Sequence, residues 1–139
     1  MSGDDDAREQ VEAIGEAAEA LWDATRRFQD QLDELENERY SRWAAYTAFR
    51  DIGSVFRFAL ERLRMEQPVP ELEEIVAAYL AGARAGFEAA ADLAEAVKDG
   101  GAESVETGIQ RLTVASQHFV RGRYLLGAYL GKPGADAPV

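Results

Sequence analysis

The sequence has no cysteine and only one histidine among its 139 residues. Without cysteine, the chain can form neither disulfides nor thiolate metal sites. No run of 18 apolar residues occurs, so no segment is predicted to span a bilayer. The first residues, 1–6, are acidic and lack the apolar stretch of a secretory signal. We therefore expect a cytoplasmic protein.

Positive charge is also scarce. The chain has 15 basic and 26 acidic residues, which gives a net charge of −11. Nucleic acids and anionic membranes attract proteins with concentrated positive charge, so neither is an expected partner. We expect instead a protein partner, either a different chain or a second copy, and no cofactor.

Apolar residues recur every three or four positions in four stretches, as in amphipathic helices. We predict helices over residues 5–36, 40–66, 70–98 and 102–130, in a single domain covering 1–130, with a disordered tail over 131–139. The predicted core stripe of the third helix comprises Leu72, Val76, Tyr79, Ala83, Gly86, Ala90, Leu93 and Val97. That of the fourth comprises Val105, Ile109, Leu112, Ser116, Phe119, Arg123, Leu126 and Leu130, beside a second line of small residues at Gly101, Gly108, Ala115 and Gly122. In the first two helices the stripes run through Leu21, Phe28 and Leu35, and through Phe49, Phe56 and the flanking Trp43.

Similar lengths and short connections favour an all-α, antiparallel up-down-up-down four-helix bundle. The helices also alternate in charge: residues 1–38 carry −10, residues 39–64 carry +4, residues 70–99 carry −5 and residues 102–132 carry +2. In a square bundle, every neighbouring pair of helices would then have opposite signs. This pattern disfavours wrong pairings.

The first turn leaves an alternative open. No glycine or proline lies between Gly15 and Gly53, and the first stripe continues in phase toward the second. The first two helices could therefore fuse into one helix of about 60 residues that dimerises as a long helical hairpin. Possible cap residues at Asn37 and Ser41 favour a turn over residues 36–41.

The single histidine lies in the run His118-Phe119-Val120-Arg121-Gly122. This run resembles the His-x-x-Lys/Arg-Gly core of histidine phosphotransfer domains, which are four-helix bundles. The resemblance implies that His118 accepts the phosphoryl group, that Arg121 steadies it, and that Gly122 leaves room for a receiver domain. It covers five residues, and bulky residues follow where that family has small ones.

A second resemblance involves the same histidine. Arg111 and His118 are seven residues apart, on one face of the predicted helix. This spacing resembles the Arg-x(4–6)-His motif of HEPN ribonucleases, and it implies RNA cleavage. The customary polar residue after the arginine is replaced by Leu112, and the acidic surface is unfavourable for RNA. With a single histidine, a di-iron carboxylate site or another metal site is not expected.

The second helix is predicted to carry an interface. Phe58 and Met65, a heptad apart and next to Val55, fall opposite its core stripe, and Arg62 lies at their edge. Large apolar residues bordered by arginine are typical of contact surfaces. The sequence therefore favours a non-enzymatic interaction or assembly module, of which a homodimer is the simplest form.

Overall fold

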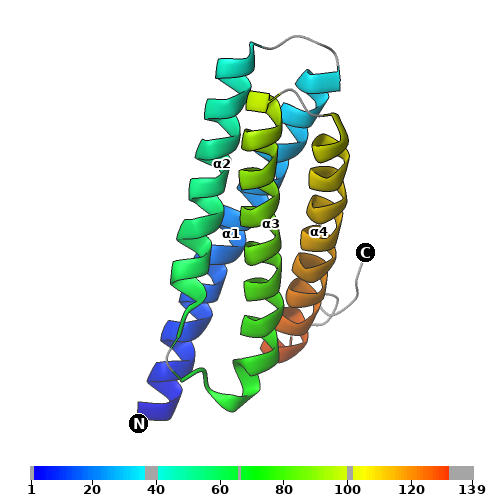
Figure 1. The fold of residues 1–139 in the computed structure, drawn as a ribbon. Helices are drawn as coiled ribbons and strands as arrows, with labels where there is room; N and C mark the ends of the chain where they lie inside the picture. Colours follow the sequence, from blue (N-terminus) through cyan, green and yellow to red (C-terminus); the bar gives the residue numbers. More distant parts are fainter. Residues whose placement is uncertain (1, 37–40, 66, 100–101, 132–139) are drawn as a thin grey trace.

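The computed structural model describes residues 2–36, 41–65, 67–99 and 102–131, and these form four α-helices and one 3-10 turn (Figure 1). The elements are α1 (Ser2–Glu36), α2 (Arg42–Leu63), η1 (Pro70–Leu72), α3 (Glu73–Asp99) and α4 (Ala102–Leu130). Each helix runs in the opposite direction to the one before it in Figure 1. The predicted all-α four-helix bundle is confirmed.

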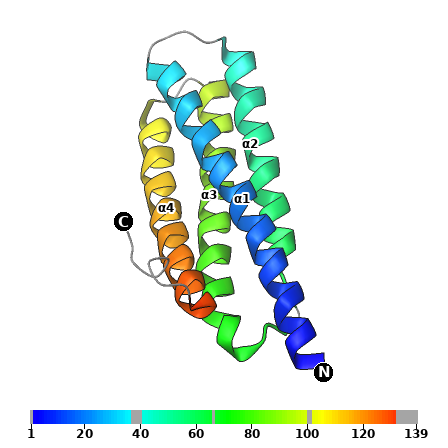
Figure 2. The ribbon, with the colours of Figure 1, turned by 180° about the vertical axis from the view of Figure 1, so that it is seen from behind.

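The fused-helix alternative is wrong, because α1 and α2 are separate helices that lie side by side (Figures 1 and 2). The Ser41 side chain caps α2 by accepting a hydrogen bond of 3.0 Å from the Ala44 amide. α2 ends at Leu63, earlier than predicted, where Arg64 turns to an extended backbone. The predicted turn around residues 37–40, the Gly100-Gly101 helix end and the tail over 132–139 lie outside the described residues, as do the side chains of Leu35 and Val105.

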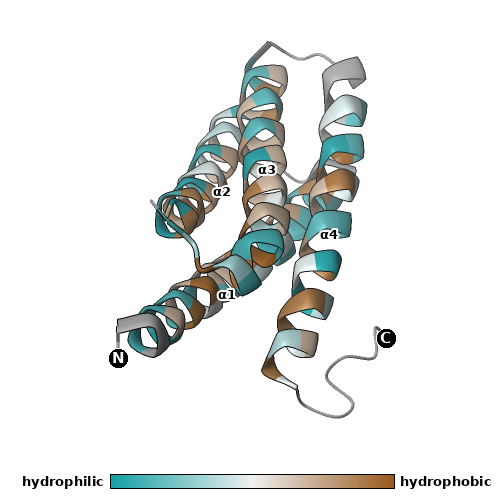
Figure 3. Cartoon of the chain, turned by 90° about the horizontal axis from the view of Figure 1, so that it is seen from below, coloured by the Kyte–Doolittle hydropathy of each residue, from teal (hydrophilic) through white to brown (hydrophobic). Residues whose placement is uncertain are grey.

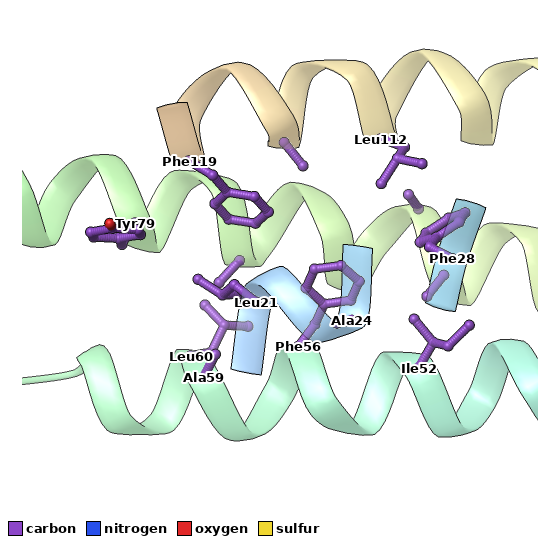
Figure 4. Packing of buried hydrophobic residues seen from close by; sticks show 14 of the residues in the cluster. Leu21, Ala24, Phe28, Ile52, Phe56, Ala59, Leu60, Tyr79, Leu112 and Phe119 are labelled. Carbon is purple, nitrogen blue, oxygen red and sulfur yellow. The ribbon is translucent and has the colours of Figure 1, made fainter. Parts of the chain in front are cut away.

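The centre of the bundle is a cluster of aromatic rings from α1 and α2 (Figure 4). Phe28, Phe49 and Phe56 are fully buried. The ring of Phe28 meets the other two edge to face, with centroid distances of 5.7 and 6.3 Å. The buried Thr25 donates its hydroxyl to the Leu21 carbonyl one turn earlier, at 2.8 Å. The ring contacts therefore join α1 to α2, and the buried hydroxyl of Thr25 has its hydrogen-bond partner within α1.

Small residues let α3 approach both of its neighbours. A Cβ added at Gly86 would overlap the ring of Phe56 from α2, and one added at Gly82 would overlap the ring of Phe119 from α4. In return, α4 presents Gly108 to Leu93, and it presents Gly122 to Tyr79, whose ring would lie 3.0 Å from an added Cβ. Rings and leucines thus fill the holes left by glycines, which brings α2, α3 and α4 close together.

α4 buries its line of small residues together with Leu112 and Phe119 of its predicted stripe. Gly108, Leu112, Ala115, Phe119 and Gly122 are buried. The prediction is wrong for Ile109, Arg123 and Leu130, which are exposed. Trp43 of α2, predicted to widen a core stripe, is likewise 75% exposed. On α4, Ile109 and Arg123 line the space between α4 and α1 instead of packing against α3.

α1 does not follow α4 along its length. It crosses the bundle obliquely, with its C-terminal end near the start of α4 and its N-terminal end on the far side, beyond α2 (Figures 1 and 2). Ion pairs between helices join Arg62 of α2 to Glu16 of α1 at 2.6 Å, and Arg111 of α4 to Asp92 of α3. These ion pairs link α1 to α2 and α3 to α4, whereas α1 and α4 diverge toward the N-terminal end of α1 (Figure 2).

Candidate functional site

Two cavities lie between α1 and α4, and we call them together the α1–α4 groove, with a first and a second section. Its first section is a cavity of about 340 Å³ lined by Gly15, Ala18, Glu19, Leu21, Trp22, Tyr79, Phe119, Val120, Arg123 and Leu126. Its second section, of about 260 Å³, is lined by Gln29, Leu32, Asp33, Ile109, Leu112, Thr113 and Ser116. Both sections take their walls from the same two helices. From Gly15 in the first section to Asp33 in the second, the two sections together span roughly 27 Å of α1 at 1.5 Å per residue.

The floor of the first section belongs to the core. Leu21, Tyr79 and Phe119 are almost completely buried. In Figure 4, Phe119 projects from α4 toward the space that also contains Leu21 of α1. A cavity with an apolar floor is a geometry that can admit side chains of another helix or an apolar ligand.

The rim of the groove exposes large apolar side chains. Trp22 on the α1 wall is 64% exposed, and Val120 on the α4 wall is 55% exposed. Hydropathy colouring shows apolar segments along α4 where the helix stands apart from α1 (Figure 3). Single exposed apolar residues are ordinary on protein surfaces, whereas apolar residues on both walls of one groove are typical of contact sites.

Three polar groups line the first section: the carboxylate of Glu19, the hydroxyl of Tyr79 and the guanidinium of Arg123. Burial raises the pKa of Tyr79 above its ordinary value, and the positive charge of Arg123 partly opposes this rise. The phenol of Tyr79 is therefore held in its neutral form. These groups give the groove one acidic wall on α1 and one basic wall on α4.

The structure does not gather the predicted interface residues of α2 into one exposed patch. Phe58 is 50% exposed, but Val55 and Met65 are partly buried against the core cluster. The outward position predicted for Met65 is wrong because α2 ends at Leu63, so the heptad spacing no longer sets its direction. Arg62 holds Glu16 of α1 with two nitrogens, at 3.0 and 2.6 Å. The role of this surface as an interface stays a prediction.

The residues of the phosphotransfer and nuclease resemblances lie on α4, away from the groove. His118 is half-buried, and Arg121 is exposed. Gly122 is buried beneath the ring of Tyr79, so the clearance it provides is used by α3 rather than left open to another domain. Arg111 is joined to Asp92 of α3. The geometry supplies neither an open glycine beside His118 nor an unengaged Arg111.

The described residues contain no group of three or more His, Asp or Glu side chains placed to hold a metal ion. None of their helices has the length and apolar character needed to cross a membrane.

Sequence reasoning missed the two most exposed apolar residues of the groove, Trp22 and Val120. Neither lies on a predicted core stripe, so each resembled an ordinary surface residue. The sequence of α4 did carry a signal for the groove itself. It has a line of small residues beside a stripe of larger apolar residues, and both lines are suited to burial. A single neighbouring helix covers only one such line, so the other line was a candidate for an open surface.

No family model, curated protein or solved structure matches this chain. The function must therefore be argued from the α1–α4 groove and its residues.

Proposed function

We propose that this chain is a non-enzymatic protein–protein interaction module whose binding face is the α1–α4 groove. One observation carries the proposal: α1 and α4 diverge, and the space between them is lined by the apolar side chains of Leu21, Phe119 and Val120. An uncovered seam of a helical bundle is the kind of surface on which an amphipathic helix packs. The proposed compartment is the cytoplasm, in keeping with the cysteine-free sequence.

Trp22 can supply part of the binding energy at this face. A tryptophan buries about 150–250 Å² in a contact, and apolar burial stabilises by about 25 cal/mol per Å². Covering the exposed part of Trp22, which is 64% of the residue, would then contribute on the order of 3 kcal/mol as an upper value. Aromatic anchors of this kind dominate many interfaces.

The catalytic alternatives receive less support. A phosphorelay needs room for a receiver domain at Gly122, and that room is occupied by Tyr79. A nuclease needs Arg111 to face its substrate, and Arg111 is held by Asp92. The acidic surface adds a further penalty for RNA.

Capture from a lysate of the source cells, at native salt, tests the proposal. Three baits are compared: the native chain, Val120→Glu, and Val114→Glu as the matched control. Val114 lies on the same helix, is 45% exposed, and does not line the groove. We expect at least one protein, which can be the chain itself, to be held by the native and Val114→Glu baits and lost with Val120→Glu. Equal capture by all three baits would overturn the proposal.

A further inference from the structure

We infer that the occupant of the α1–α4 groove is a second copy of this chain, which docks face to face about a two-fold axis parallel to the helices. This inference rests on the proposed function, and it names the partner. The two α1–α4 faces would cover each other, and each α1 would lie against the α4 of the other copy.

Charge selects this arrangement. α1 contains twelve acidic and three basic residues, whereas α4 contains two acidic and three basic residues. The groove repeats this difference, with Glu19 and Asp33 on the α1 wall and Arg123 on the α4 wall. A basic helix from another protein would meet Arg123, and an acidic helix would meet Glu19. A second copy with its walls exchanged satisfies both sides at once.

The orientation of the axis follows from the same charges. The chain carries a net charge of −11, so two copies repel each other at long range. A two-fold axis across the helices would place acidic α1 against acidic α1. A two-fold axis parallel to the helices exchanges the walls, and it places α1 against α4. Only the second arrangement pairs opposite charges, as the Arg62–Glu16 and Arg111–Asp92 ion pairs already do within the chain.

The positions along the bundle also agree. A rotation about an axis parallel to the helices keeps every residue at its own height. Trp22, Val120 and Arg123 line one section of the groove, so they share a height. Trp22 of one copy would therefore meet Val120 and Arg123 of the other, where an indole can stack on a valine and a guanidinium. A knob and its receiving site on the same face are what a self-complementary interface requires.

The area suffices for a specific dimer. The face is roughly 27 Å long and about two helices, or 18–20 Å, wide. Each copy would then bury about 500 Å², and the dimer about 1,000 Å² in total, at the lower end of specific interfaces. A reversible dimer, rather than an obligate one, is expected from this area.

Sedimentation of the purified chain over a range of concentrations is the first test. We expect the native chain and Val114→Glu to rise toward twice the protomer mass of 15.3 kDa. Val120→Glu and Trp22→Glu should stay monomeric while retaining the helical circular dichroism of the native chain. Trp22→Glu is included so that the outcome does not depend on one substitution.

Cross-linking tests the orientation, because a chain without cysteine accepts single reporter thiols. Gln29 and Ser116 line the second section of the groove from opposite walls. A short bis-maleimide should join Gln29→Cys to Ser116→Cys when the two variants are mixed, and it should join neither to itself. Replacing Ser116→Cys by Val114→Cys should remove the product. Cross-linking of Gln29→Cys alone would place α1 against α1, and it would overturn the proposed axis.

The outcomes separate the inference from the proposed function. If the native chain stays at 15.3 kDa at every concentration while lysate capture depends on Val120, the second copy is wrong and the binding face stands. If neither mass nor capture depends on Val120, both proposals are wrong.

Discussion

The two sides of α4 differ in what their neighbours bring to them. Toward α3, glycines on both helices receive Phe119, Leu93 and Tyr79, and the helices close on each other. Toward α1, the walls present Trp22, Val120 and Arg123, and a groove remains. Both sides carry large apolar side chains. The comparison shows that apolar character alone does not close a seam between helices, because closure also needs a small residue opposite each large one.

The largest effect is expected on the free energy of unfolding, when a ring in the closed core and an indole on the groove rim are each replaced by alanine. Phe56→Ala should lower the free energy of unfolding by about 3–5 kcal/mol, since it empties a fully buried ring site. Trp22→Ala should change it by no more than about 0.5 kcal/mol at dilutions where the chain is monomeric, since the indole faces solvent. Urea titration followed by circular dichroism measures both. Equal losses would mean that the groove is part of the core, and the comparison would fail.

Two glycines sharpen the comparison with the same substitution. Gly86→Ala gains about 1 kcal/mol of helix propensity. It also forces a methyl group into the ring of Phe56, and overpacking of this kind costs about 1–3 kcal/mol. Gly15 lies on the groove wall, and a Cβ added there meets nothing within 4 Å. Gly15→Ala should therefore stabilise the chain by about 0.5–1 kcal/mol.

Thermal and urea unfolding of both alanine variants check these signs. We expect Gly86→Ala to unfold more easily than Gly15→Ala. Stabilisation by both substitutions would show that Phe56 yields without cost, and that α2 and α3 are less tightly packed than their rings indicate.

The smallest expected effect is on the pKa of Tyr79, a residue of α3 that packs on Gly122 of α4 and also lines the groove. Burial raises the pKa of its phenol, so the contribution of the neutral form to stability is complete below the unfolded-state pKa of about 10. That contribution is lost as the pH rises through the folded-state pKa. Arg123→Ala removes the opposing positive charge, so it should raise the pKa of Tyr79 further. Tyrosinate absorbance, with Tyr79→Phe subtracted, measures the change.

Arg121→Ala is the matched control, because Arg121 is exposed on the same helix and does not line the groove. It should leave the titration of Tyr79 unchanged. A fall in the pKa of Tyr79 in Arg123→Ala would contradict the role given to Arg123.

Sequence periodicity predicted the fold and most of its core. All eight positions predicted on α3, from Leu72 to Val97, are buried, because α3 has neighbours on both sides and a wide apolar stripe. On α4 the same reasoning selected Ile109, Arg123 and Leu130, which are exposed. Periodicity identifies the apolar lines of a helix, but it does not say which line a neighbour covers. The groove depends on that choice, and on the oblique path of α1, which no local pattern encodes.

The side chain of Gln10 joins α1 to the segment between α2 and η1. Its amide nitrogen donates to the Gln67 carbonyl at 3.1 Å, and its amide oxygen accepts from the Val69 amide at 2.9 Å. The first helix thereby holds both ends of the bend that leads from α2 into η1, more than fifty residues later in the chain. These bonds close a long loop, which slows the search for the native topology. Docking of α1 and formation of that bend are therefore coupled, and α1 completes these contacts only after α2 and the bend have been synthesised.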